Sequence, residues 1–418
     1  MRVLEGKAAE RYVLSLERRG TRLDEIEPAV RGIVEDVREK GDRALLKYAR
    51  KFDDLEPKQS LHVPQGELPK AWRNASSQLR AALREAEKNI RRFCEWQKPR
   101  EWIRSKDGIG LGQLVRPLES VGCYVPGGRF PLISTLLMTV IPAQVAGVKN
   151  IRVASPRPSS EVLAAAAMLG VQDFYRVGGA QAIAAFAYGT ESIPRVDKIV
   201  GPGNIYVTAA KKLVSFDCTI DMLAGPTEVV IVSTGGKAAF IAADLVAQAE
   251  HDPETLAVFI TTSKKLAAQV VSELGGGRGP SSLGENDIAA GSIESRGAVL
   301  IAHSRQQAFD WANRIAPEHI TVERGDLPRV QNAGSVFVGD YSAQAAGDYA
   351  SGPNHVLPTA GAARFRGGLG VMDFVKLITV QELSSRGLRR IAPTIVTLAE
   401  TEGLRTHADS IRVRCAHA

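Results

Sequence analysis

Long apolar runs are missing from this chain of 418 residues. Its apolar stretches, such as residues 183–188, fall far short of the roughly 20 residues that a membrane-spanning helix needs. Residues 1–7 contain basic side chains but no long apolar core, so we expect no secretory signal. The sequence therefore predicts a globular protein with no membrane partner.

Cysteine is scarce, and no two cysteines form a C-x-x-C pair. The four residues are Cys94, Cys123, Cys218 and Cys415. Such wide spacing is typical of a reducing compartment, and we expect a cytoplasmic protein. It also excludes a disulfide framework and a zinc site built from cysteines.

The common nucleotide and nucleophile fingerprints are missing as well. The sequence has no G-x-G-x-x-G after a predicted strand, no G-x-x-x-x-G-K-[ST] loop and no G-x-S-x-G elbow. A dinucleotide, if one binds, must therefore be held without the usual fingerprint.

The charge balance leaves two interpretations open. The formal net charge is +7, and residues 91–106 combine basic side chains with Phe93, Trp96 and Trp102. Basic residues beside aromatic ones can form a nucleic-acid surface. Since acidic residues are interleaved with the basic ones, we favour the polar face of an amphipathic helix, and we expect no nucleic-acid partner.

Both ends of the chain have helical patterns. Apolar residues at helical spacing predict helices over residues 28–52, interrupted near Gly41, and over residues 69–96. The glycine-rich segment 107–113 predicts a turn or short hairpin. Residues from about 370 onward again predict helix.

Between these ends, short β-branched runs alternate with alanine-rich stretches. The predicted strands are 121–125, 151–154, 174–177, 198–200, 229–233, 256–261, 298–302, 320–322 and 336–338. Strands that alternate with helices predict parallel sheets. Nine strands are too many for one small sheet, so we predict an α/β protein with two Rossmann-like domains and helical extensions at both termini.

Three glycine-rich segments, 124–128, 177–182 and 200–204, each follow a predicted strand. Their backbone N–H groups would gather at the carboxyl edge of a parallel sheet, where phosphates bind. Tight turns alone would also use these glycines, but three in succession favour a nucleotide site.

Two polar pairs lie in otherwise apolar sequence. Gln248 and His251 are three residues apart on a predicted helix, so they share one face. Glu318 and His319 are adjacent before a strand, and imidazole with carboxylate is typical of acid/base chemistry. A helix-dipole contact for the first pair and an exposed loop for the second are the structural alternatives.

Further polar residues lie in the loop 346–358, which contains Asp348 and His355, and in the tail near His407. Together, Gln248, His251, Asp348 and His407 offer nitrogen and oxygen ligands that suit zinc or a similar divalent metal. Their spacing along the sequence supports a common site only for Gln248 and His251, which lie on one predicted helix.

These segments together resemble the histidinol dehydrogenase family. The matching motifs lie at residues 124–128, 178–183, 201–204, 224–228, 248–251, 316–319 and 347–358. The resemblance implies oxidation of L-histidinol to L-histidine through histidinaldehyde, in histidine biosynthesis, with two NAD per substrate. It also implies a zinc-dependent, intertwined homodimer.

The resemblance also assigns residues and domains. It implies the zinc ligands Gln248, His251, Asp348 and His407, the last from the partner chain, and the acid/base pair Glu318 and His319. It implies that the substrate contacts are Thr227, His355 and Glu402, together with His319 and the four metal ligands. It implies that the NAD contacts are Tyr124, Gln181 and Asn204. The expected parts are an extension at 1–19, a large domain at 20–123 plus 226–369, an NAD-binding domain at 124–225 and a tail at 370–418.

The implied chemistry has one rival. His319 would remove the hydroxyl proton of the alcohol, Glu318 would activate water to hydrate the aldehyde, and His319 would then deprotonate the hydrate. A thiohemiacetal on Cys123 is the alternative, but no neighbour in the sequence promises to lower the pKa of that thiol.

The sequence departs from the family pattern in two places. The loop 128–132 lacks the usual small residues, and Thr227 stands where serine is common. Relatives on this scaffold oxidise other small polar alcohols, including a sulfonated propanediol, for which Arg129 would be an anion contact rather than a surface residue. Glu402 and His407 favour histidinol.

Overall fold

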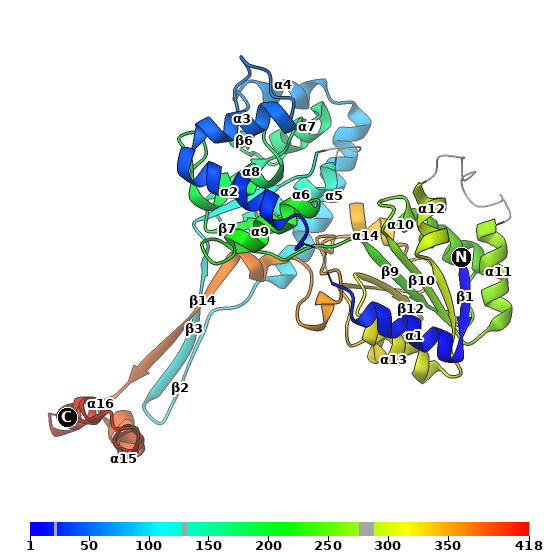
Figure 1. Ribbon diagram of the computed structural model, residues 1–418. Coiled ribbons are helices and arrows are strands. Elements are labelled where there is room, and N and C mark those ends of the chain that lie inside the picture. The colour runs from blue at the N-terminus through cyan, green and yellow to red at the C-terminus, as the bar shows by residue number, and fades with distance from the viewer. Residues whose placement is uncertain (21–22, 128–131, 276–287, 418) are drawn as a thin grey trace.

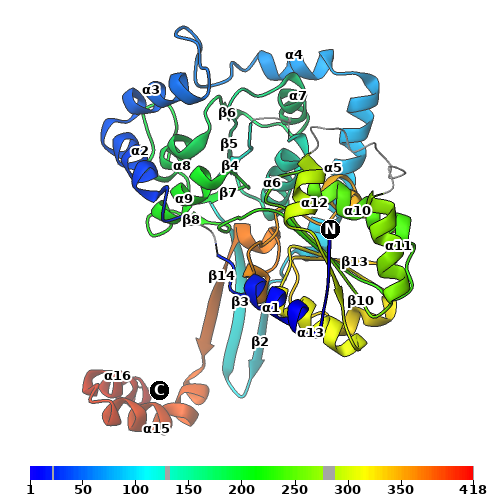
Figure 2. The same ribbon diagram turned by 45° about the vertical axis from the view of Figure 1, so that its right-hand side comes forward.

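The computed structural model describes residues 1–20, 23–127, 132–275 and 288–417. These residues form two α/β lobes joined to a thin arm, and the arm ends in two helices (Figure 1). The turned view also leaves those two helices clear of both lobes (Figure 2). Each lobe is built on one parallel sheet, as the alternating strands and helices of the sequence predict.

The first lobe contains a five-stranded sheet in which every pairing is parallel. Its strand order is β6 (Asp173–Tyr175), β5 (Asn150–Ala154), β4 (Ser120–Tyr124), β7 (Lys198–Val200) and β8 (Thr219–Ile220). Its crossover helices are α6 (Ile133–Ala146), α7 (Ser160–Met168), α8 (Gly179–Tyr188) and α9 (Ile205–Val214). One apolar core lies on each face of the sheet.

The helices within residues 27–97 pack on this same lobe. They are α2 (Glu27–Lys40), α3 (Asp42–Phe52), α4 (Glu67–Asn74) and α5 (Ser77–Gln97). Helix α2 contacts α8 and α9, α4 contacts α7, and α5 contacts α6. Gly41, with a φ of 53°, separates α2 from α3, where the interruption was predicted. The predicted domain boundaries stay a prediction.

The second lobe contains a six-stranded, fully parallel sheet. Its strand order is β1 (Arg2–Glu5), β11 (Ala298–Ile301), β10 (Leu256–Thr261), β9 (Glu228–Val232), β12 (His319–Val322) and β13 (Ser335–Val338). Its helices are α1 (Gly6–Glu17), α10 (Ala238–Ala249), α11 (Lys264–Gly275), α12 (Ile288–Ser295), α13 (Arg305–Ile315) and α14 (Gln344–Tyr349).

All nine predicted strands are present, within two residues at either end. The expectation of a purely helical N-terminal extension is wrong for residues 2–5, because β1 forms the edge strand beside β11. A four-residue strand that is mostly exposed carries no alternating pattern, so only its pairing across the chain reveals it.

The arm corrects the prediction for the tail. Residues 375–383, expected to be helical, form β14 (Val375–Leu383), which pairs antiparallel with β3 (Ile109–Pro117). Strand β3 also pairs with β2 (Trp102–Lys106) in the hairpin predicted near 107–113. Helices α15 (Ser385–Thr401) and α16 (Arg405–Ala416) complete the arm. Both faces of β14 are largely exposed, so the sequence lacks the period-2 pattern of a strand over a core.

Within the described residues, no helix combines the length and apolarity that crossing a bilayer requires. The basic segment 91–106 lies along the end of α5 and in β2. Its charges have close acidic partners, since Arg91 pairs with Glu87 and Lys98 pairs with Glu95. The absence of a nucleic-acid partner stays a prediction.

Candidate active site

The predicted acid/base pair lies at the amino edge of the six-stranded sheet. Residues Thr227 and Glu228 lie at the start of β9, and Glu318 and His319 lie at the start of β12. These strands are adjacent and parallel, with His319 opposite Val229, so their amino ends meet. This register brings residues that are about 90 positions apart into hydrogen-bond contact.

A chain of hydrogen bonds holds the Glu318 carboxylate. The backbone N–H of Glu228 donates to Oε2 of Glu318 at 2.9 Å, and the hydroxyl of Thr227 donates to the same oxygen. The amide Nε2 of Gln248 in turn donates to the Thr227 hydroxyl. Thr227 therefore bridges a predicted metal ligand and a predicted catalytic carboxylate.

His319 is held with one ring nitrogen free for chemistry. Its Nδ1 lies 3.1 Å from the carbonyl oxygen of Glu228, so Nδ1 carries a hydrogen atom and donates it. Its Nε2 is buried without a hydrogen-bond partner among the described residues and lies 3.7 Å from Oδ1 of Asp348. The ring packs 5.8 Å from that of Phe337, and the residue is 2% exposed. Nε2 is thus the atom available to a ligand.

Burial and neighbouring charges shift the pKa values of this cluster. Burial raises the pKa of Glu318 to about 7, which places its titration at neutral pH. Burial lowers the pKa of His319, but the carboxylates of Glu318 and Asp348 outweigh this and raise it to about 9. Burial also lowers the pKa of His355. Such opposed shifts are typical of acid/base sites.

Three of the four predicted metal ligands lie in this region. Gln248 lies in the last turn of α10, His251 follows that helix, and Asp348 lies on α14, which contacts α10. Charge interactions link Asp348 to both His251 and His355, and the carbonyl oxygen of Asp348 lies 2.9 Å from Nδ1 of His355. Since Gln248 uses its Nε2 to donate to Thr227, its amide oxygen is the atom that could ligate a cation.

This donor set of amide oxygen, imidazole and carboxylate fits zinc or a similar divalent cation. In the part of the chain that the structure describes, no three histidine, cysteine or acidic residues form a metal group by themselves. Of the predicted ligands, only His251 and Asp348 belong to those residue types within the lobe. The fourth predicted ligand, His407, lies in α16 at the end of the arm.

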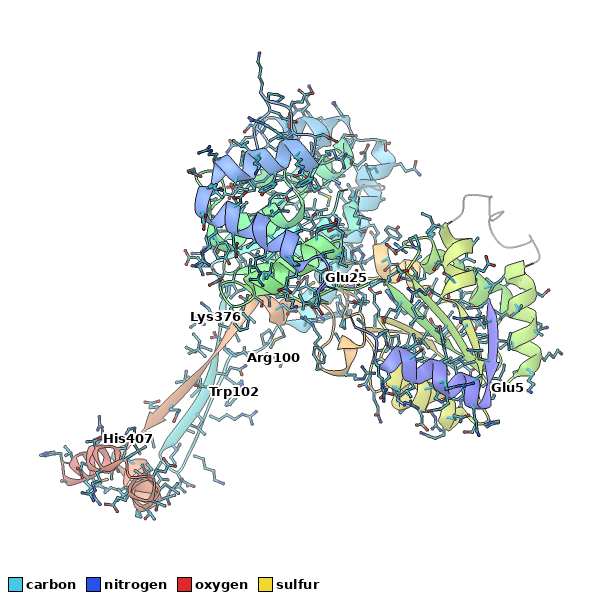
Figure 3. The ribbon with its side chains drawn as sticks, in the orientation of Figure 1. Glu5, Glu25, Arg100, Trp102, Lys376 and His407 are labelled. Carbon is cyan, nitrogen blue, oxygen red and sulfur yellow. The ribbon has the colours of Figure 1, made fainter. Side chains whose placement is uncertain are left out.

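Glu402 and His407 lie on the arm and not beside the other site residues. Glu402 caps the end of α15, and His407 lies in the first turn of α16. Figure 3 shows His407 at the far end of the arm, away from both lobes. Within one chain, the fold therefore does not bring these two residues to Glu318 and His319.

The predicted NAD contacts lie at the carboxyl edge of the five-stranded sheet, where β4, β6 and β7 end. The hydroxyl of Tyr124 accepts from the N–H of Gly179 at 3.2 Å. Gln181, 1% exposed, donates to Asp53 at 3.0 Å. Asn204 is exposed and caps α9 by accepting two backbone N–H bonds, a contact worth about 1 kcal/mol. The three glycine turns thus meet at one edge, as predicted.

Two buried carboxylates that the sequence did not reveal support these turns. Asp53 accepts from the N–H of Gly178 at 2.9 Å, and burial raises its pKa. Asp221 accepts from the N–H of Gly201 at 2.7 Å, while Lys211 donates to the carbonyl of Gly201 at 3.0 Å and pairs with Asp221. Asp53 is 125 positions from its partner Gly178, so no local pattern could have found it.

The thiol alternative fails on burial. Cys123 is 0% exposed, and burial raises the pKa of its thiol to about 12, so a thiolate nucleophile is not available there. Arg129, the anion contact of the other alternative, lies outside the described residues.

Comparisons with known proteins show what this chain is similar to. The family model described as histidinol dehydrogenase matches residues 16–415. A histidinol dehydrogenase from Geobacter sulfurreducens is 46% identical over 402 residues, covering 93% of this chain and 93% of its own length. A histidinol dehydrogenase from Methanosarcina mazei is 47% identical over 408 residues, covering 95% of this chain and 93% of its own length. The crystal structure of histidinol dehydrogenase from Elizabethkingia anophelis matches with a TM-score of 0.93 and 34% identity, covering 100% of this chain and 98% of that one. This chain therefore belongs to the histidinol dehydrogenase family.

Proposed function

We propose that this protein oxidises L-histidinol to L-histidine through histidinaldehyde, with two NAD as the hydride acceptors, in histidine biosynthesis. The observation that carries the proposal is the buried pair of Glu318 and His319 in a chain of this family. Their roles follow from which atoms the fold leaves free.

His319 is the base for the alcohol. Because its Nδ1 donates to the carbonyl of Glu228, only Nε2 can accept the hydroxyl proton of the substrate, and it does so in the neutral form of the ring, whose share rises as the pH approaches the pKa of about 9. As that proton moves to Nε2, the hydride leaves the carbinol carbon for the nicotinamide ring, which supplies the redox chemistry when NAD is bound. The product of this step is the aldehyde.

Glu318 is the base for water. With a pKa of about 7, its carboxyl group is substantially ionised at neutral pH and basic enough to accept a proton. The water oxygen adds to the aldehyde carbon and its proton passes to Glu318. The aldehyde oxygen takes the proton that Nε2 of His319 gained in the first step, so the hydrate forms and Nε2 is free again. His319 then removes a hydroxyl proton from the hydrate while a second hydride leaves to a second NAD, which yields the carboxylic acid.

We propose that Gln248, His251 and Asp348 hold zinc, with His407 of a second copy of the chain as the fourth ligand. When bound there, zinc would supply a Lewis-acid anchor for the nitrogen groups of the substrate, so that these residues would orient the carbinol carbon. His355 contacts the backbone of Asp348, and Thr227 accepts a hydrogen bond from Gln248, so both would line the same substrate pocket. Glu402 would enter that pocket together with His407.

The arm supports a homodimer. It exposes large apolar side chains, including Ile103 at 60%, Leu398 at 58% and Val413 at 57%. Apolar groups that lack cover in one chain favour an interface with another. We propose that two arms embrace the opposite subunits and carry Glu402 and His407 to their sites.

We propose that NAD binds at the glycine turns near Tyr124, Gln181 and Asn204, on the part of the first lobe that residues 124–225 form. Residues 226–369 then carry the metal and the acid/base pair. A cytoplasmic location is consistent with cysteines that are unpaired in the described structure, and it too is a proposal.

A steady-state assay of NADH formation tests the function. We expect two NADH per L-histidinol, loss of turnover with a chelator, and recovery on adding zinc. Turnover of a sulfonated propanediol without turnover of histidinol would overturn the proposal in favour of a related alcohol dehydrogenase. His319→Asn with full activity would overturn the assigned base.

A further inference from the structure

We propose that Arg19 and Glu228 form a positioning pair that holds the side chains of Glu318 and His319 in place through the backbone of Glu228. This inference rests on the proposed function. Neither residue is among the site residues that the sequence suggested. Arg19 follows α1, whereas Glu228 begins β9, so the pair ties the N-terminal extension to the edge of the sheet that carries the acid/base residues.

The contact is a two-pronged ion pair in a buried place. Nε and Nη2 of Arg19 donate to the two carboxylate oxygens of Glu228, each at 2.7 Å. The side chain of Glu228 is 4% exposed and that of Arg19 is 16% exposed. A guanidinium fork on a carboxylate fixes direction as well as distance, which a lysine cannot reproduce.

The backbone of Glu228 transmits this fixation to both reacting side chains. Its N–H donates to Glu318 at 2.9 Å, and its carbonyl oxygen accepts from Nδ1 of His319. The backbone of this one residue therefore sets both the position of the Glu318 carboxylate, through its N–H, and the tautomer of the His319 imidazole, through its carbonyl oxygen. Moving the Glu228 side chain would disturb both.

The same pair also holds two strained turns next to the site. Ala316 and Ala360 have φ values of 50° and 53°, a left-handed conformation that is costly for residues other than glycine. Nη1 of Arg19 donates to the carbonyl of Ile315 at 2.8 Å, directly before Ala316. The N–H of Ala360 donates to Glu228 at 3.0 Å. The turn at Ala316 leads to Glu318 two residues later, so its conformation aims the catalytic segment.

The first test compares Arg19→Ala with Arg314→Ala. Arg314 also ties α1 to its lobe, through Glu10 and Glu17, but does not contact Glu228, which makes it a matched control. We expect Arg19→Ala to lower kcat for histidinol about 10- to 100-fold through misplaced groups. The KM for NAD should stay within about twofold, since the NAD turns lie on the other lobe. Added guanidinium should restore part of kcat.

Arg314→Ala should keep kcat within about threefold of wild type. Equal kcat losses in the two variants, or a kcat of Arg19→Ala within about threefold of wild type, would overturn the pairing. If Arg19→Ala does not fold, Glu228→Gln decides, because it keeps the size of the side chain and an acceptor for Ala360. An unchanged kcat in Glu228→Gln would then refute the proposal.

Amide hydrogen exchange provides a measurement that needs no substrate. The Glu228 amide should exchange about tenfold faster in Arg19→Ala, or in Glu228→Gln, than in wild type, and in Arg314→Ala it should not. Unchanged exchange would overturn the proposal even if activity fell. A wild-type enzyme that does not oxidise histidinol would overturn the proposed function, while the exchange rates would still decide the positioning pair.

Discussion

Replacing Thr227 by valine should move the pH dependence of the second oxidation. Valine keeps the shape of threonine but removes the hydroxyl that donates to the Glu318 carboxylate. That hydrogen bond stabilises the ionised form, so its loss must raise the pKa of Glu318 above its present value of about 7. The carboxylate is the active form of this base, so activity rises with pH.

The size of the effect follows from the energy of one charged hydrogen bond. Such a bond contributes about 1.5–3 kcal/mol. At roughly 1.4 kcal/mol per pH unit, the midpoint of the basic group should rise by about 1–2 pH units. At pH 7 about half of the Glu318 groups are ionised in the wild type, against roughly 1–10% in Thr227→Val. The step that needs the carboxylate should slow about 5- to 50-fold there and recover at higher pH.

The assay is NADH formation from histidinaldehyde with saturating NAD, followed across roughly pH 6 to 9.5. Two basic groups titrate in this range, Glu318 near pH 7 and His319 near pH 9, and the midpoint compared between variants is the lower one. Thr227→Ser is the matched control, because it keeps the hydroxyl and loses only a methyl group. Gln248 also loses an acceptor in Thr227→Val, and this should lower the plateau of activity without moving its midpoint. The same midpoint in Thr227→Val and wild type would refute Glu318 as the titrating base.

Other expectations test the remaining parts of the site. Cys123→Ser should keep kcat within about twofold, because the thiol is buried and un-ionised; a tenfold loss in the same NADH assay would restore the thiol mechanism. Mixed dimers of His319→Asn and His407→Ala chains should regain about a quarter of wild-type activity, since half of the dimers hold one intact site. No recovery after the two inactive proteins are unfolded and reassembled together would contradict a shared site. Asp53→Ala should raise the KM for NAD about tenfold through loss of its bond to Gln181, whereas Asp53→Asn keeps an acceptor oxygen and should change the KM little.

Local patterns of sequence were sufficient for much of this protein. Buried strands such as β9 and β10 are continuous apolar runs between turn residues, so their existence and parallel pairing followed from composition alone. The glycine turns and the adjacent Glu318 and His319 could be recognised for the same reason, because each lies within a few residues of chain. The resemblance to a family supplied their roles.

Tertiary structure decided what depends on distant partners. Strands β1 and β14 could not be read from the sequence, because their edges and faces are exposed and only pairing defines them. The burial of Glu318, which sets its pKa, depends on contact with Glu228, about 90 positions away. The contact between Arg19 and Glu228 joins residues that are 209 positions apart. Sequence periodicity reports which side of an element is buried, not what it is buried against. The place of His407, at the end of an arm and away from the other ligands of its own chain, is likewise a consequence of the fold and not of spacing.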